Sequence, residues 1–328
     1  EQDGKIEKYF YNRLTVRAKM FYNYTRMNSL RRQCGNGKTT QTGTIKMFYT
    51  LQNRHAKIKV NDFGAELSSV VIDGKERLWQ NSDGTWNEHA PLLFPVCGHF
   101  GCTVDGKTYP MPTHGFAKEF PFVAEKQTKS RLVFTLVSSP KTEKYYPYHF
   151  SYSVEYRLHG RKLTILHTVK NLAETPLYFA CGGHESYLLD GSVSDYKLVF
   201  PLSETFVHRP HNEEGYLTGA RETLGVGNEL ILPDNYLSGG ATVILEKLRS
   251  RKVSLLKTSG EKCADISFSG FENLLLWRPD KAKMVCIEPW SNLPDEAIAN
   301  PKEFSKKDGV FKVEGLKSKR LKRSIRYY

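Results

Sequence analysis

Short runs of alternating apolar and polar residues fill most of the chain from Met47 onward. Alternation with a period of two is typical of β-strands that bury one face. The clearest runs are Ala65–Ile72, Cys102–Val104, Lys107–Met111, Arg131–Val137, Phe150–Leu158, Arg161–Val169, Tyr196–Phe200, Ala241–Glu246, Lys252–Leu256, Cys263–Phe268, Leu274–Trp277 and Met284–Ile287. The pattern therefore predicts many short strands.

Glycine-containing turns join several of these runs. Asp73-Gly74, Asp105-Gly106 and His159-Gly160 each follow one run and precede the next. Tight turns of this kind connect neighbouring antiparallel strands. We find no amphipathic helix longer than two turns. The sequence thus predicts an all-β fold, a large antiparallel β-sandwich.

Residues 1–46 differ from the rest of the chain. They are polar and basic, with a net charge of +7 and little alternation, and residues 301–328 carry another +7. We expect 1–46 to be a poorly ordered extension that folding does not need, and 47–328 to form one β-sandwich domain.

The overall net charge of +13 resembles that of a nucleic-acid-binding protein. However, residues 47–300 have a net charge of −1, and the chain offers no readable recognition element. We therefore expect no specific nucleic-acid partner. No run approaches the roughly 20 apolar residues of a membrane span, and the six cysteines lack a disulfide-framework spacing. These features favour a reduced, cytoplasmic protein with no membrane partner, and they leave the oligomeric state open.

Three short segments place polar side chains in unusual surroundings. His114 lies in a loop between Pro112 and Gly115, His184 follows two glycines, and Glu288 ends an apolar run just before a proline and Trp290. A histidine and a carboxylate can form a general acid–base pair. Taken singly, a loop histidine is usually an ordinary hydrogen-bonded surface residue and a glutamate at a strand end is usually solvated, and the sequence does not place them side by side.

A possible metal site was also considered at residues 97–102. Cys97, His99 and Cys102 are potential ligands there, but their spacing matches no common zinc pattern. We therefore predict no metal ion.

The three segments together resemble those of the aldose 1-epimerase family, in its galactose mutarotase-like branch. The sequences are His-Gly-Phe-Ala-Lys at 114–118, Gly-Gly-His at 182–184 and Ile-Glu-Pro-Trp at 287–290, in the family's order. Residues 93–98 are similar to its Phe-Pro-x-x-Gly segment. The resemblance covers about 47–328 and implies a β-supersandwich that interconverts the α and β anomers of an aldose without a cofactor.

The resemblance also implies roles for individual residues. His184 would be the general acid that protonates the ring oxygen, and Glu288 the general base that removes the proton of the C1 hydroxyl. His114 would hydrogen-bond the ring oxygen or a nearby hydroxyl. His99, Lys118 and Trp290 are expected to contact the substrate, an aldose or a sugar phosphate.

Some positions depart from the family pattern. His99 stands where the family usually has arginine, Lys118 replaces another arginine, and Ala241 takes the place of a sugar-holding aspartate. Two alternatives to an aldohexose mutarotase therefore stay open. One is a carbohydrate-binding protein with weakened or lost catalysis. The other is a hexose-6-phosphate mutarotase in which Lys118 holds the phosphate.

Overall fold

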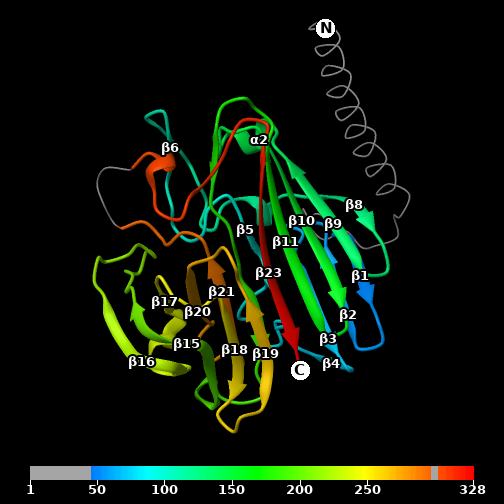
Figure 1. Cartoon of the computed structure of the whole chain (residues 1–328), viewed down its shortest axis with the longest axis vertical. Helices are drawn as coiled ribbons and strands as arrows, with labels where there is room; N and C mark the ends of the chain where they lie inside the picture. The colour runs from blue at the N-terminus through cyan, green and yellow to red at the C-terminus, as the bar shows by residue number, and fades with distance from the viewer. Residues whose placement is uncertain (1–45, 297–301) are drawn as a thin grey trace, which may run out of the picture. The chain divides into compact units, whose positions relative to one another are not determined.

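The computed structural model describes residues 46–296 and 302–328 (Figure 1). The expectation of a poorly ordered extension over 1–46 lies, apart from Lys46, outside the described residues. The described part of the chain from Met47 forms one unit, and every pairing between its named strands is antiparallel. The expectation of an all-β fold built from large antiparallel sheets is confirmed.

One sheet of 15 strands dominates the fold. Across this sheet the strands are β5 (Leu92–Leu93), β13 (Gly182–Gly183), β21 (Met284–Trp290), β20 (Asn273–Trp277), β17 (Thr242–Leu245), β15 (Tyr196–His208), β18 (Lys252–Lys257), β19 (Lys262–Ser267), β23 (Ser318–Tyr327), β11 (Lys162–Asn171), β10 (Phe150–His159), β9 (Arg131–Val137) and β8 (Val123–Gln127). In addition, β14 (Glu185–Leu188) pairs with β21, and β16 (Glu222–Ile231) pairs with β15.

Smaller sheets and short helices complete the described part. A four-stranded sheet contains β1 (Phe48–Gln52), β2 (Ala56–Asn61), β3 (Leu67–Ile72) and β4 (Lys75–Glu76), and two-stranded sheets pair β6 (Cys102–Val104) with β7 (Lys107–Tyr109) and β12 (Leu177–Phe179) with β22 (Phe311–Val313). The helices are α2 (Pro140–Glu143), α3 (Asp234–Leu237) and the 3₁₀ turns η1 (Ala117–Glu119), η2 (Val193–Asp195), η3 (Ser238–Gly240) and η4 (Phe304–Lys306). None exceeds four residues, as the sequence predicted for the part described here.

Part of the main core lies where the four-stranded sheet meets β9 and β10. Along β10 the buried and less buried side chains alternate, so that Tyr152 and Tyr156 both point inward. The Tyr156 hydroxyl donates a hydrogen bond of 2.7 Å to the carbonyl of Ala65, and the rings of Tyr49 and Phe134 make an edge contact across the two sheets. Apolar burial of this kind stabilises the fold and fixes which face of each strand turns inward.

The turns behave as their residues predict. Asp73 and Gly74 between β3 and β4, and Asp105 and Gly106 between β6 and β7, all have positive φ angles. Two consecutive positive φ values produce the tight turn whose twist matches that of a hairpin. The main strand that the alternation did not predict is β16. Most of its residues are exposed, so its sequence does not alternate between apolar and polar residues.

Candidate active site

Strand β21 carries the central residues of the site. All seven of its residues are buried, and the two-residue alternation of a strand points Cys286, Glu288 and Trp290 to one face. In the neighbouring strands, Glu185 of β14 pairs with Ile287 of β21, and Gly182 of β13 pairs with Trp290 of β21. This antiparallel register places His184, the residue before Glu185, opposite Glu288.

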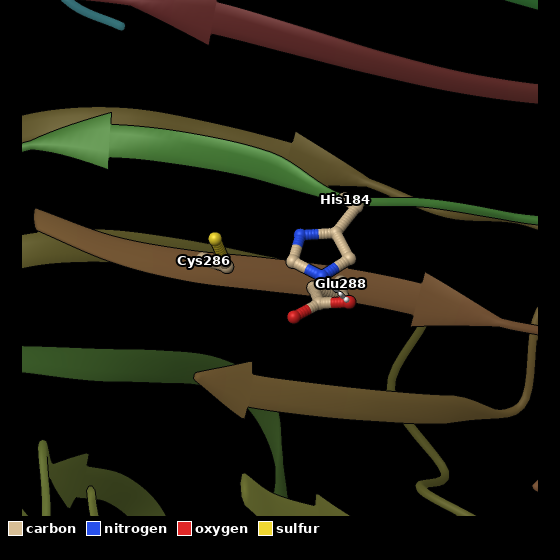
Figure 2. A group of neighbouring side chains, drawn as sticks. All are labelled: His184, Cys286 and Glu288. Atoms are coloured by element: carbon tan, nitrogen blue, oxygen red, sulfur yellow. Dashed lines mark ion pairs between the residues drawn. The ribbon is translucent and has the colours of Figure 1, made fainter. Parts of the chain in front are cut away.

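The structure thus brings together the histidine and the carboxylate that the sequence could not place side by side. His184 Nε2 and Glu288 Oε2 are 3.3 Å apart, and Figure 2 shows the imidazole directly over the carboxylate. His184 is 7% exposed and Glu288 is 1% exposed. A proton can pass between the two groups at this distance.

Burial changes the proton affinity of both members of this pair. Loss of water lowers the pKa of His184 to about 3, and the charge of Lys118 acts in the same direction. Burial also raises the pKa of Glu288 well above its usual value. The indole of Trp290 partly opposes that rise, and the charge of Glu185 adds to it. Burial therefore favours the uncharged form of each group, a neutral imidazole and a carboxylic acid.

His114 lies beside this pair in an uncommon backbone conformation. Its φ is 67°, in the left-handed region, and its ring centroid is 5.4 Å from that of His184. The backbone N–H of Gly98 donates to His114 Nδ1 over 3.1 Å. Burial, followed by the charges of His184, Lys118 and His99, holds the pKa of His114 well below its usual value. The neutral ring must then carry its proton on Nε2, where it is a hydrogen-bond donor.

Trp290 is bound to the carboxylate. Its indole N–H donates to Glu288 Oε2 over 3.1 Å, and its ring makes an edge contact with His114 at 5.2 Å. Trp290 is only 4% exposed. It therefore orients Glu288 and packs beside His114, while contact with a substrate stays an expectation.

Two further tryptophans surround His184, and the sequence analysis did not single them out. The ring of Trp86 lies 5.2 Å from that of His184 at an interplanar angle of 31°, and the ring of Trp277 lies 5.6 Å away, edge-on. An indole in the polar turn around Gly84 was the available signal for Trp86, because large aromatic rings seldom occupy such turns without a partner. Trp277 ends an apolar strand, and nothing in the sequence separated it from the core.

The two remaining predicted residues lie at the edge of the site. Lys118 Nζ is 3.1 Å from Glu88 Oε1, so its charge already has a carboxylate partner. His99 contacts the hydroxyl of Thr113, and its ring lies 5.3 Å from that of Tyr216. Thr113 precedes His114 in the chain, so its contact with His99 places His99 near that residue.

The thiol of Cys286 on β21 adds a third potential metal ligand to the pair. His184, Cys286 and Glu288 are buried, and their ligand atoms lie within 4.8 Å of one another; no other group of this kind was found among the described residues. The segment containing Cys97, His99 and Cys102 does not form such a group. The five cysteines in the described ranges are all unpaired.

A sizeable cavity lies away from this pair. It has a volume of about 640 Å³ and is lined by residues such as Arg209, Asn273, Asn292 and Lys307, but not by His184 or Glu288. We place the chemistry at the His184–Glu288 pair because the acid–base geometry is there. No helix in the described ranges is long and apolar enough to cross a membrane.

Comparisons with known proteins agree with this fold. The aldose 1-epimerase family model matches residues 47–312. The LacX proteins of Lactococcus lactis are 29% identical over 266 residues, covering 75% of this chain and 88% of theirs.

Solved structures give the same result. A galactose mutarotase-like protein from Lactobacillus casei is 28% identical with a TM-score of 0.80, covering 86% of this chain and 100% of its own. A galactose mutarotase related enzyme from Lactobacillus acidophilus is also 28% identical, with a TM-score of 0.77 and coverage of 86% and 97%. The fold is galactose mutarotase-like, and the chain belongs to the aldose 1-epimerase family.

Proposed function

We propose that this protein interconverts the α and β anomers of an aldohexose, with His184 and Glu288 as the acid–base pair. The observation that carries the proposal is the 3.3 Å separation of His184 Nε2 and Glu288 Oε2 in a buried site. Anomer exchange requires one group to give a proton and another to take one, and this pair holds one proton between two acceptors.

The proton balance of the reaction fits this pair. To open the ring, His184 gives a proton to the ring oxygen as the bond from C1 to that oxygen breaks, and Glu288 takes the proton of the C1 hydroxyl as the aldehyde forms. The pair then consists of a neutral imidazole and a carboxylic acid. This is also the state that burial favours in the free protein. In the free protein, transfer of the proton from Glu288 to His184 prepares the pair for a cyclic sugar. When the ring closes on the other face of the aldehyde, Glu288 gives its proton to the aldehyde oxygen and His184 takes the proton of the attacking hydroxyl.

His114 is suited to assist at the ring oxygen. Its Nδ1 accepts the backbone N–H of Gly98, so its Nε2–H is the donor available to a sugar oxygen. Because the ring is neutral, it can support the developing charge without competing for the proton of the pair.

The ion pair of Lys118 favours a free sugar over a sugar phosphate. Lys118 is already neutralised by Glu88 at 3.1 Å, so a phosphate would have to displace a carboxylate from it. The second alternative, a sugar-binding protein with little turnover, differs from our proposal in rate and not in the residues of the site.

Anomer exchange can be measured directly by polarimetry or exchange NMR on freshly dissolved α-glucose and α-galactose, with their 6-phosphates in parallel. We expect a rate above the spontaneous one. His184→Asn and Glu288→Gln should each lower the protein-dependent rate by about 10²–10⁴-fold. The double variant should lose little more, because the two residues act on one proton-transfer event.

His149→Asn serves as the matched control, because His149 is an exposed histidine paired with Glu143. It should leave the rate unchanged. If sugar binds but the rate equals the spontaneous one, the binding-protein alternative is correct. If both site variants keep the full rate, the assignment of the pair is wrong.

A further inference from the structure

Cys286 has no part in the proposed acid–base chemistry, yet it shares the face of Glu288. The two residues are separated by one position on β21, so their side chains point the same way, and His184 faces them from the adjacent chain. In a sheet, two alternate residues of one strand and the opposed residue of the next project from the same face and are neighbours there. Figure 2 shows the imidazole over the carboxylate, with the thiol to one side of both.

The distances are close to those of a metal centre. The ligand atoms of His184, Cys286 and Glu288 lie within 4.8 Å of one another, and the His184 nitrogen and Glu288 oxygen are 3.3 Å apart. Ligands of a tetrahedral zinc ion, at about 2.0–2.3 Å from the metal, are separated by about 3.3–3.8 Å. A side-chain rotation that moves a ligand atom by about 1 Å would bring the separations into the range of a tetrahedral site.

We propose that His184, Cys286 and Glu288 bind one thiophilic divalent cation of the zinc class, and that this ion blocks the acid–base pair. The donor set of one nitrogen, one sulfur and one oxygen suits zinc and leaves a fourth position open. On binding, the Cys286 thiol gives its proton to the solvent and binds as thiolate. Mg²⁺ and Ca²⁺ prefer all-oxygen ligand sets and should not bind here. The metal site goes beyond the proposed function and does not depend on sugar turnover.

Cobalt provides a probe that reads the ligands directly. The full chain is stripped with a chelator, loaded with one equivalent of Co²⁺ without air, and its absorption spectrum is recorded, followed by calorimetric titration with Zn²⁺. We expect a thiolate-to-cobalt charge-transfer band that Zn²⁺ removes. Cys286→Ser should abolish the band and weaken Zn²⁺ binding by at least about tenfold, and His184→Asn should weaken binding similarly.

Cys97→Ser is the matched control, because Cys97 is also a fully buried free thiol but lies outside the group. It should keep both the band and the affinity. If Cys286→Ser does not fold, the Zn²⁺ titration and the Co²⁺ spectrum of His184→Asn replace it, and both the affinity and the band should fall.

The outcomes separate the two proposals. A band that survives in Cys286→Ser, or a wild-type chain that binds no equivalent of Zn²⁺, overturns the metal site. If the charge-transfer band is lost in Cys286→Ser and the wild-type chain shows no anomer exchange, the metal site is supported and the proposed function is refuted. If both hold, Zn²⁺ should inhibit anomer exchange in the wild-type chain and in Cys97→Ser, and Mg²⁺ should not.

Discussion

The guanidinium of Arg323 lies directly against the backbone of Gly183, the residue before His184. A methyl group at Gly183 would lie 2.4 Å from Arg323 Cζ, which no real contact allows. Arg323 also pairs with Glu185, the residue after His184, and both members of the pair are about 2% exposed or less. One buried cation on β23 thus holds both neighbours of the proposed acid.

Gly183→Ala should damage the site through this contact. Overpacking a rigid, buried position typically costs about 1–3 kcal/mol of unfolding free energy, and the displaced strand should carry His184 out of line with Glu288. Urea denaturation and polarimetry measure the two effects. Gly225→Ala is the control, because the nearest atom to its added methyl is 3.9 Å away. Equal behaviour of the two variants would show that the close contact is unimportant.

The Arg323–Glu185 pair should show strong coupling. Arg323→Met leaves Glu185 charged and buried, which should cost about 3–5 kcal/mol of unfolding free energy. Adding Glu185→Gln to that variant should recover part of the loss, since the uncompensated charge is then gone. A double-mutant cycle by denaturant unfolding gives the coupling energy. Strict additivity of the two substitutions would contradict the role of the ion pair.

His114 should be neutral with its proton on Nε2. Because Gly98 N–H donates to Nδ1 and burial lowers the pKa, nitrogen-15 NMR of the ring should show this tautomer from about pH 6 to 8. His114→Asn should keep the fold, because asparagine tolerates positive φ, while the anomer exchange rate falls by about 10²-fold. A protonated ring at neutral pH, or an unchanged rate, would refute the role given to His114.

Lys118→Met tests the phosphate alternative. Because Lys118 is paired with Glu88, we expect the substitution to change the binding of free hexose and of hexose 6-phosphate by the same factor. Glu88→Gln is the companion variant, because it removes the other half of the ion pair. Calorimetric titration with both ligands gives the comparison. A loss of about tenfold to a hundredfold for the phosphate alone would instead establish a phosphate site at Lys118.

Asp265 should contribute to stability only above acidic pH. Burial raises its pKa, but hydrogen bonds from Ser254, Tyr328 and Lys262 outweigh burial and lower the pKa to about 2, from 3.8. A carboxyl whose pKa is lower in the folded state stabilises fully above its unfolded pKa and loses that contribution as the pH falls to the folded value. The difference in unfolding free energy between wild type and Asp265→Asn should thus be constant above about pH 5 and change between about pH 4 and 2. Denaturant unfolding across this range is the measurement, and a difference independent of pH would contradict the lowered pKa.

Much of the local structure was predictable from the chain alone. Alternation located the strand that carries Glu288, and paired turn residues such as Asp105 and Gly106 located hairpins, because both signals depend only on neighbours in sequence. The resemblance to a family selected His114, His184 and Glu288 before any geometry was known. Strand β16 was not predicted, because a strand with mostly exposed residues has no apolar alternation in its sequence.

Only the tertiary structure decided what these residues can do together. The register of β14 against β21 places His184 opposite Glu288, and a slip of one residue would turn the two side chains to opposite faces. The same packing brought Cys286 and the indole of Trp86 to the pair, and it removed the water whose loss sets the proton affinities of His184 and Glu288. The sequence by itself determined which side chains are available and which face of a strand each occupies. Their distances and their burial depend on contacts between segments far apart in the chain, so the folded structure alone could fix them.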